Sequence, residues 1–321
     1  MAGTTLTTTA GITDQIQRYF DRKLLVQTLK TIVLDQFAFK AALPGKAGAK
    51  TIRFFRYPEA ATTNVIGMTE GTLRTIGESK QLNLTSVDVA LEQWGQTVTI
   101  SDLLSAVELF STMEQATTQN GQDAALKVDE LLRNILGDSA AIQLRYAGAA
   151  TNYATVTGSD DAMTALDILD AATNLRVNNA RPTGGYFTAI MAPEIARDLM
   201  NDDDWLEASK YGNPDQLFKG EVGRYMGVRV IATTNPYRQT LQHTYAAAGT
   251  RYSTFVVGDQ AYGGVNLATM SAYSPKMIIS QGADKYDPLA QFTTVGFKFY
   301  YGGAIINANH AVNIYSVTNY S

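Results

Sequence analysis

The chain has 321 residues, a formal net charge of −4 at neutral pH, no cysteine and only two histidines. Without cysteine, disulfides and thiolate chemistry are excluded, and two histidines make a histidine-rich metal centre or a catalytic triad hard to assemble. Only 17% of residues are charged and no dense lysine or arginine run exists, which disfavours binding to many nucleic-acid phosphates. Neither a signal peptide nor a membrane-spanning stretch is recognisable, so we expect a soluble protein that is not exported.

The first segment reads as a leading arm. Thr13 can cap a helix in which Ile16, Phe20 and Leu24 recur at four-residue spacing. This apolar stripe needs a surface to lie on. Pro44 then ends the helical region.

The next segment predicts an extended β-hairpin. Residues 51–57 read as a strand that Pro58 ends, and residues 82–100 read as a second strand whose alternation changes parity near Thr85 and Ser86, as a β-bulge would produce. Between them lies GMTEGTLRTIGES at 67–79, a glycine-rich stretch without chemical groups suited to catalysis. It is either an ordinary surface loop or a hairpin tip adapted to contact with a neighbour.

A long helical pattern follows the hairpin. Ser101 is a good N-cap, and apolar residues at three- and four-residue spacing predict one helix from 101 to 135. The polar stretch 117–122 contains Gly121, and a kink or break there is the alternative to one continuous helix.

The rest of the chain predicts a mixed α/β region and closing strands. We expect a helix over 162–177, a strand over 187–191, a helix opened by Pro193, and strands at 228–233 and 254–258. Alternating apolar residues then cover 293–301 and 306–314. Gly302 and Gly303 between them favour a hairpin turn, although they also suit a bend within one long strand.

Candidate chemical sites are few. The acidic run Asp202–Asp204 with Glu207 could hold a calcium ion, but it lacks the pattern of a dedicated loop and better fits a solvated turn that caps a helix. His310 shares the parity of a strand and reads as a half-buried, hydrogen-bonded histidine. The segment GKAGAKT lacks the glycines of a phosphate-binding loop. We therefore predict no catalytic, cofactor-binding or metal-binding residue, and no enzyme.

The order of these parts resembles the α+β Hong Kong 97-type fold of tailed-bacteriophage major capsid proteins. Several sequence segments resemble those of the N4-like family of these capsid proteins. Among them are MTEGT at 68–72, VALEQWGQTVTISDLL at 89–104 and DPLAQFTTVGFKFYYGGAIIN at 287–307. The resemblance implies five parts: an N-terminal arm at 1–47, an extended loop at 48–100, a spine helix and peripheral domain at 101–150, an axial domain at 151–270, and C-terminal strands returning to the peripheral domain at 271–321.

The resemblance also implies a function. It suggests hexamers and pentamers in an icosahedral virion shell that encloses double-stranded DNA, assembled in the host cytoplasm with a separate scaffolding protein and a portal. Inter-subunit contacts are expected from the arm, at Ile16, Phe20 and Leu24, and from the hairpin tip, at Gly67, Glu70, Gly71, Arg74 and Gly77. The alternatives are an encapsulin-like nanocompartment shell and an α/β enzyme centred on 150–270, with a cleft lined by Asp202–Asp204 or His243.

Overall fold

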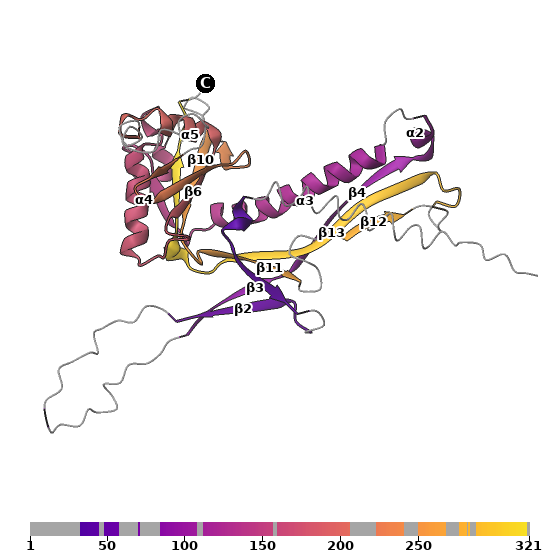
Figure 1. Cartoon of the computed structure of the whole chain (residues 1–321), viewed down its shortest axis with the longest axis horizontal. Helices are drawn as coiled ribbons and strands as arrows, with labels where there is room; N and C mark the ends of the chain where they lie inside the picture. The colour runs from indigo at the N-terminus through magenta and orange to yellow at the C-terminus, as the bar shows by residue number, and fades with distance from the viewer. Residues whose placement is uncertain are drawn as a thin grey trace, which may run out of the picture.

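The structure is a computed structural model that describes residues 33–44, 48–57, 70, 84–107, 112–156, 159–205, 223–240, 250–267, 276–280, 282 and 287–319. Within them the chain forms a five-stranded sheet, a seven-stranded sheet and a two-stranded ribbon. Figure 1 shows the long helix α3 (Thr112–Gly137) beside the long strands of the five-stranded sheet, which extend away from the seven-stranded sheet.

Each sheet draws strands from distant parts of the chain. The five-stranded sheet has the order β1 (Phe39–Leu43), β11 (Tyr262–Leu267), β13 (Phe292–Ile305) and β12 (Lys276–Ser280), with β4 (Glu92–Ser101) also paired to β13. The seven-stranded sheet has the order β5 (Gln143–Tyr146), β14 (Ala311–Ser316), β10 (Thr250–Val257), β6 (Phe187–Met191), β8 (Val228–Ala232) and β7 (Arg224–Tyr225), with β9 (Tyr237–Thr240) on β10. The ribbon pairs β2 (Thr51–Arg56) with β3 (Thr85–Ala90). The remaining helices are η1 (Leu34–Gln36), α2 (Asp102–Val107), η4 (Tyr153–Thr155), η5 (Ser159–Asp161), α4 (Ala165–Val177), α5 (Pro193–Met200) and η6 (Ala308–His310).

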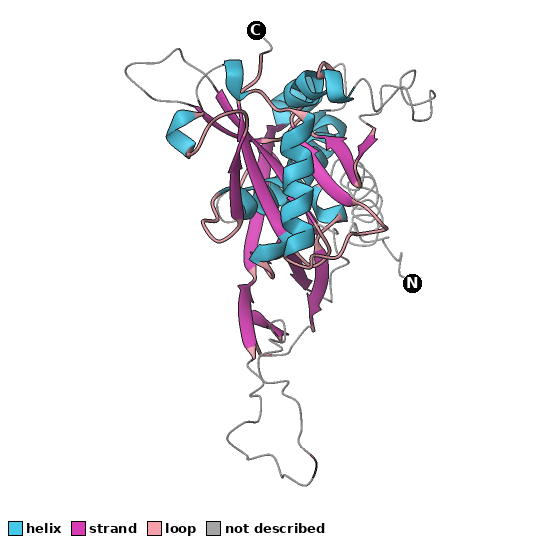
Figure 2. Ribbon diagram, turned by 90° about the vertical axis from the view of Figure 1, so that its left-hand side faces the viewer, coloured by secondary structure: helices cyan, strands magenta, loops and turns pink. Residues whose placement is uncertain are grey.

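The seven-stranded sheet forms the larger core. The central strand β6 is buried along its whole length, as a continuous apolar run between two neighbouring strands should be. Helix α4 begins where the Thr164 backbone nitrogen donates to Asp167 Oδ2 at 2.9 Å, and α5 begins with Pro193 at its first turn. Both helices contribute fully buried side chains to this core, and Figure 2 shows helices lying against the strands at this end of the molecule. The predicted strand at 187–191 and the helix opened by Pro193 are confirmed.

Helix α3 covers the five-stranded sheet with small and polar side chains at its start and larger ones at its end. Thr117, Asn120 and Gly121 are buried, and Asn120 Nδ2 donates to the backbone oxygen of Val295 in β13 at 3.3 Å. Further along, Val128 joins leucines of the same face in the core shared with the sheet.

The single predicted helix from 101 to 135 is wrong in one respect. The structure describes two helices over this range, α2 and α3, and α3 is continuous through 117–122, where the sequence left a kink or break open. Two polar side chains of this stretch bond without breaking the helix: Thr117 Oγ1 donates to the backbone oxygen of Met113 at 2.8 Å, and Asn120 Nδ2 donates to the sheet. Asn120 Oδ1 is buried without a hydrogen-bond partner among the described residues.

The closing strands also differ from the favoured prediction. Gly302 and Gly303 do not form a hairpin turn; they lie inside the fourteen-residue strand β13. The reason is a close approach, since a Cβ atom at Gly302 would lie 2.1 Å from the backbone oxygen of Ala90 in the ribbon. The alternative of one long strand is therefore correct.

The second hairpin strand is interrupted at Leu91, between β3 and β4. The predicted parity change near Thr85 and Ser86 stays a prediction, because Leu82, on which it depends, lies outside the described residues. The backbone nitrogen of Leu91 donates to the Lys50 oxygen at 3.0 Å, and its side chain is buried. Here the strand leaves β2 as its partner and joins β13.

The C-terminal segment 271–321 is divided between the sheets. Strands β12 and β13 lie in the five-stranded sheet, whereas β14 pairs with β10 and β5 in the seven-stranded sheet. The prediction placed all strands of 271–321 together, and β14 differs from it. Alternating apolar residues do not reveal which sheet a strand joins.

Candidate assembly surfaces

The ribbon carries exposed aromatic side chains. Phe55 and Tyr57 follow one another on the same face and are 62% and 67% exposed. Across the ribbon, Arg53 Nε and Nη2 bind Asp88 Oδ1 and Oδ2 at 2.6 and 2.7 Å, in a solvent-exposed pair. Such pairs contribute little to stability, and a two-stranded hairpin is marginal by itself. The outer face of the ribbon is thus available for contact.

The root of the ribbon is held firmly. Leu43, Val89, Leu91 and Val265 form a small buried core beneath it, joining β1, β3 and β11. Phe54 packs edge-on against Phe39, with ring centroids 5.8 Å apart. The base of the ribbon is therefore packed, and Figure 1 shows β2 and β3 projecting beside β11.

A second feature is the point at which the leading arm joins the folded chain. Asp129 of α3 accepts hydrogen bonds from the backbone nitrogens of Val33 and Leu34, at 3.3 and 3.0 Å. Its other carboxylate oxygen accepts from Asn235 Nδ2 at 3.1 Å, and Arg133 in turn donates to the side-chain oxygen of Asn235. The start of η1 is therefore fixed to the long helix.

The same junction is tied to the five-stranded sheet. Asp35 is buried, accepts a hydrogen bond from the Tyr301 hydroxyl at 2.9 Å and forms an ion pair with Lys40 at 2.6 Å. The Tyr262 hydroxyl donates to the backbone oxygen of Leu34. Burial raises the pKa of Tyr262 and of Tyr301, so both remain hydrogen-bond donors at any physiological pH.

Burial also raises the pKa of Asp129 above its ordinary value. Hydrogen bonds from Leu34, Asn235 and Val33 and the nearby charge of Arg133 act in the opposite direction but do not cancel the cost of burying the charge. The junction of the arm thus contains a carboxylate whose ionisation opposes folding.

A third surface lies at the far end of the five-stranded sheet. Four large apolar side chains are between 49% and 77% exposed there, and we call them the distal apolar patch: Leu103, Leu104, Leu289 and Phe292. They share one end because Ser101 pairs with Phe292 and the Asp102 nitrogen donates to the Gln291 oxygen at 2.8 Å. Large exposed apolar side chains that share one end of a sheet are typical of contact sites.

Most predicted contact residues lie outside the described residues: Ile16, Phe20, Leu24, Gly67, Gly71, Arg74 and Gly77. Glu70 is described, lies in a turn and is exposed. Their roles stay predictions. Sequence reasoning missed Phe55 and Tyr57, although the adjacent aromatic pair Phe54 and Phe55 in a predicted strand signalled apolar side chains on both of its faces.

The candidate chemical residues have structural roles where they are described. Asp202 Oδ2 accepts a hydrogen bond from the Ala165 nitrogen at 2.6 Å, at the start of α4. His310 is half-buried in η6, and its Nδ1 lies 2.8 Å from the backbone oxygen of Asp259. Glu207 and His243 lie outside the described residues. Within the described ranges no group of three or more potential metal ligands occurs, and no helix is long and apolar enough to cross a membrane.

Comparison with solved structures identifies the architecture. The chain is similar to the capsid of Ralstonia phage GP4, with a TM-score of 0.67 and 14% identity over 90% of this chain and 92% of that chain. The fold is of the Hong Kong 97 type. The predicted α+β class of this fold is confirmed.

Two further structures share the Hong Kong 97-type fold. The capsid of cyanophage P-SCSP1u matches with a TM-score of 0.63 and 17% identity, over 90% of this chain and 89% of that chain. The holo-SrpI encapsulin complex from Synechococcus elongatus PCC 7942 matches with a TM-score of 0.55 and 10% identity, over 91% and 90%. No protein-family model and no curated protein sequence matches the chain.

Proposed function

We propose that the chain is the major capsid protein of a tailed bacteriophage and that its copies form a closed icosahedral shell around double-stranded DNA. The observation that carries this proposal is the ribbon, whose Phe55 and Tyr57 project from a rigid base with no cover from the described chain. An exposed two-stranded edge is an aggregation hazard for a monomer, but it is a contact surface for a neighbouring copy. The fold shared with phage capsids supports this reading.

The proposed shell depends on many contacts between subunits. Each subunit offers the ribbon and the distal apolar patch at separate ends, which favours head-to-tail contacts closing into hexamers and pentamers. Individually weak contacts become strong when many act together, so a chain without disulfides can form a durable shell. We also propose the predicted division into arm, extended loop, spine helix and peripheral domain, axial domain and C-terminal strands, except that β14 belongs with the seven-stranded sheet.

The finer assignments are proposals as well. We assign the chain to the N4-like capsid proteins because of the sequence blocks they share. We propose assembly in the host cytoplasm, with a separate scaffolding protein and a portal, and a final place in the virion. The acidic net charge of −4 suits a shell that confines DNA without binding it tightly.

An encapsulin-like compartment is the second candidate, since an encapsulin shares the fold over most of both chains. The phage structures match with higher TM-scores, which favours the viral reading. Purified particles from the native source distinguish the two: nuclease-protected DNA supports a capsid, and an enclosed protein supports a compartment.

Sedimentation and electron microscopy of the purified full chain test assembly itself. We expect shells, tubes or capsomer-sized rings. A variant carrying Phe55→Ser and Tyr57→Ser should remain folded but form fewer of them, whereas Leu166→Ser, which changes a 59% exposed side chain of α4, serves as the matched control. A wild-type chain that stays monomeric at high concentration, with or without a scaffolding protein, contradicts the proposal.

A further inference from the structure

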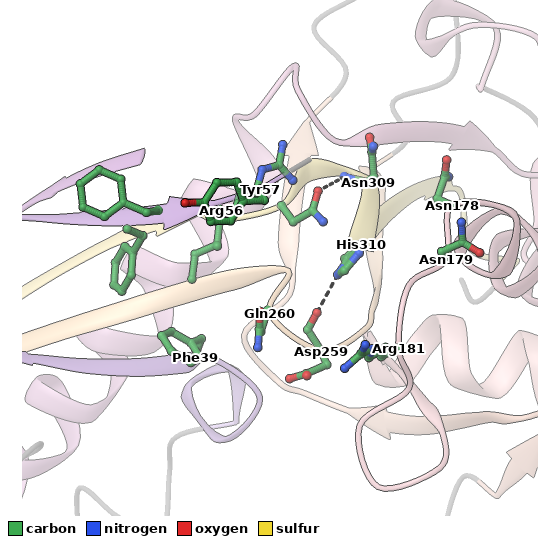
Figure 3. A pocket seen from close by; sticks show the side chains of 14 residues that line it. Phe39, Arg56, Tyr57, Asn178, Asn179, Arg181, Asp259, Gln260, Asn309 and His310 are labelled. Atoms are coloured by element: carbon green, nitrogen blue, oxygen red, sulfur yellow. Dashed lines mark hydrogen bonds between the residues drawn. The ribbon is translucent and has the colours of Figure 1, made fainter. Parts of the chain in front are cut away.

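A pocket of about 600 Å³ lies between the root of the ribbon and the seven-stranded sheet. Five separate parts of the chain line it, as Figure 3 shows: β1 with Phe39, the end of β2 with Arg56, the α4–β6 connection with Arg181, the β10–β11 turn with Asp259, and the β13–β14 turn with Asn309 and His310. The pocket is open to solvent, so a segment of protein can enter it.

The positive charge of this pocket is not neutralised within the described chain. Arg56 Nε is buried and has no hydrogen-bond acceptor among the described residues. The Arg181 side chain is exposed, and no carboxylate of the described residues lies within ion-pair distance of it. Asp259 is the one acidic residue in the lining, and its backbone oxygen is the partner of His310. A buried donor without an acceptor is costly and calls for a partner.

Other arginines of the chain form ion pairs with carboxylates. Arg53 binds Asp88, Arg145 binds Asp170 and Arg238 binds Glu194, each with a nitrogen-to-oxygen distance of 2.9 Å or less. The guanidinium groups in the pocket differ in having no such carboxylate. A carboxylate is the group whose geometry the guanidinium fork fits best.

The aromatic residues of the pocket lining also favour an occupant with apolar atoms. Phe55 and Tyr57, the exposed aromatic residues of the ribbon, also belong to the lining. An occupant that satisfies both features carries a carboxylate to the arginines and apolar atoms to the aromatic rim. A small anion supplies only the first of these, whereas a peptide segment supplies both.

We propose that this pocket binds an acidic segment of a second copy of the chain, whose carboxylate accepts hydrogen bonds from Arg56 and Arg181. The inference rests on the proposed shell function and adds to it a specific contact at the root of the extended loop. Charge complementarity supports the choice of occupant, because the chain carries 30 acidic against 26 basic side chains and is net negative. Docking there also fixes the ribbon against the seven-stranded sheet of its own chain.

The first test removes the two guanidinium groups. In Arg56→Gln with Arg181→Gln, the subunit concentration needed for assembly should rise about tenfold or more, because charge-assisted hydrogen bonds are lost. The thermal unfolding of dissociated subunits should not change, since neither side chain has a partner carboxylate among the described residues. Arg56→Lys with Arg181→Lys keeps the charge without the fork and should fall between the two.

The matched control is Arg229→Gln with Lys276→Gln, which removes the same charge from two exposed positions outside the pocket. It should assemble nearly as the wild type does. Equal effects of the pocket pair and the control pair would show that net charge alone matters and would overturn the proposal.

The second test finds the occupant directly. Because the chain contains no cysteine, Asn309→Cys places a single thiol at the rim for a photoactivatable crosslinker. In assembled particles we expect crosslinks to a peptide of another subunit that contains aspartate or glutamate. Crosslinks confined to the same chain, or to peptides without acidic residues, would overturn this inference while leaving the shell intact. Failure of the chain to form particles at all would instead refute the proposed function.

Discussion

Asp129 Oδ1 and the backbone nitrogen of Leu34 are 3.0 Å apart and form a buried hydrogen bond between the long helix and the first described helical turn. The residues are separated by more than ninety positions in the chain. Their contact fixes the position of Leu34 on the long helix. An arm that reaches a neighbouring subunit therefore starts from a set position on α3.

This contact predicts a pH dependence of stability. Burial raises the pKa of Asp129 above its ordinary 3.8, so the folded chain holds this proton more tightly than the unfolded chain does. The stability from this group is fully present below pH 3.8 and is lost as pH rises through the raised value. In Asp129→Asn this dependence disappears. Urea denaturation of dissociated subunits measures the unfolding free energy of the wild type and of the variant. The wild-type value minus the variant value should therefore decrease as pH rises.

Asp203→Asn provides the control, because Asp203 is exposed. The unfolding free energy of this variant should change with pH as that of the wild type does. A difference between wild type and Asp129→Asn that grows with pH over the same interval would mean that the carboxylate is stabilised, and not destabilised, in its charged form.

Tyr301→Phe removes the hydroxyl that donates to the buried carboxylate of Asp35 at 2.9 Å. Losing a hydrogen bond to a buried charge costs about 1 to 3 kcal/mol, and calorimetry of dissociated subunits measures it. Tyr300→Phe changes the neighbouring half-buried residue, which pairs across the sheet from Gln93, and should cost less than about 0.5 kcal/mol. Equal losses in both variants would exclude a specific role for the Asp35 bond.

Gly302→Ala tests the close approach of β13 to the ribbon. The added methyl group would meet the Ala90 backbone oxygen, and we expect a loss of about 1 to 3 kcal/mol together with faster hydrogen exchange in β3. At Gly303 the same methyl group would meet the ends of the Ile135 and Leu132 side chains, which can move, so Gly303→Ala should be milder. If the two substitutions have the same effect, the backbone contact does not hold the ribbon.

Leu103→Ser combined with Leu289→Ser tests the distal apolar patch. Both side chains are more than three-quarters exposed, so the stability of dissociated subunits should change by less than about 0.5 kcal/mol. Assembly, followed by light scattering, should need a higher subunit concentration because contacts between copies are lost. Unchanged assembly would remove the patch from the set of inter-subunit surfaces.

The local elements were predictable where one pattern dominates. The apolar run at 187–191 and the proline at 193 each predict an element directly, and both elements occur as expected. The order of parts also led to the correct fold class. Where two patterns compete, distant contacts decide: Gly302 faces Ala90, and Asn120 faces Val295, so neither residue ends its element.

The candidate surfaces were harder to predict. The pocket joins Arg56, Arg181 and Asn309, which approach one another only once the ribbon, α4 and β14 are in place. No local pattern marks such a set. Exposure of Phe55 or Leu103 is likewise a property of the finished fold, because the same alternation would bury them under a neighbouring strand or helix.

The most direct test of the account is a cryo-EM map of assembled particles at side-chain resolution. We predict closed shells in which Phe55 and Tyr57 are covered by an adjacent subunit, and in which residues 1–32 contact a chain other than their own. A map in which the ribbon and the arm contact only their own chain, or a protein that remains monomeric at high concentration, would contradict the central claim.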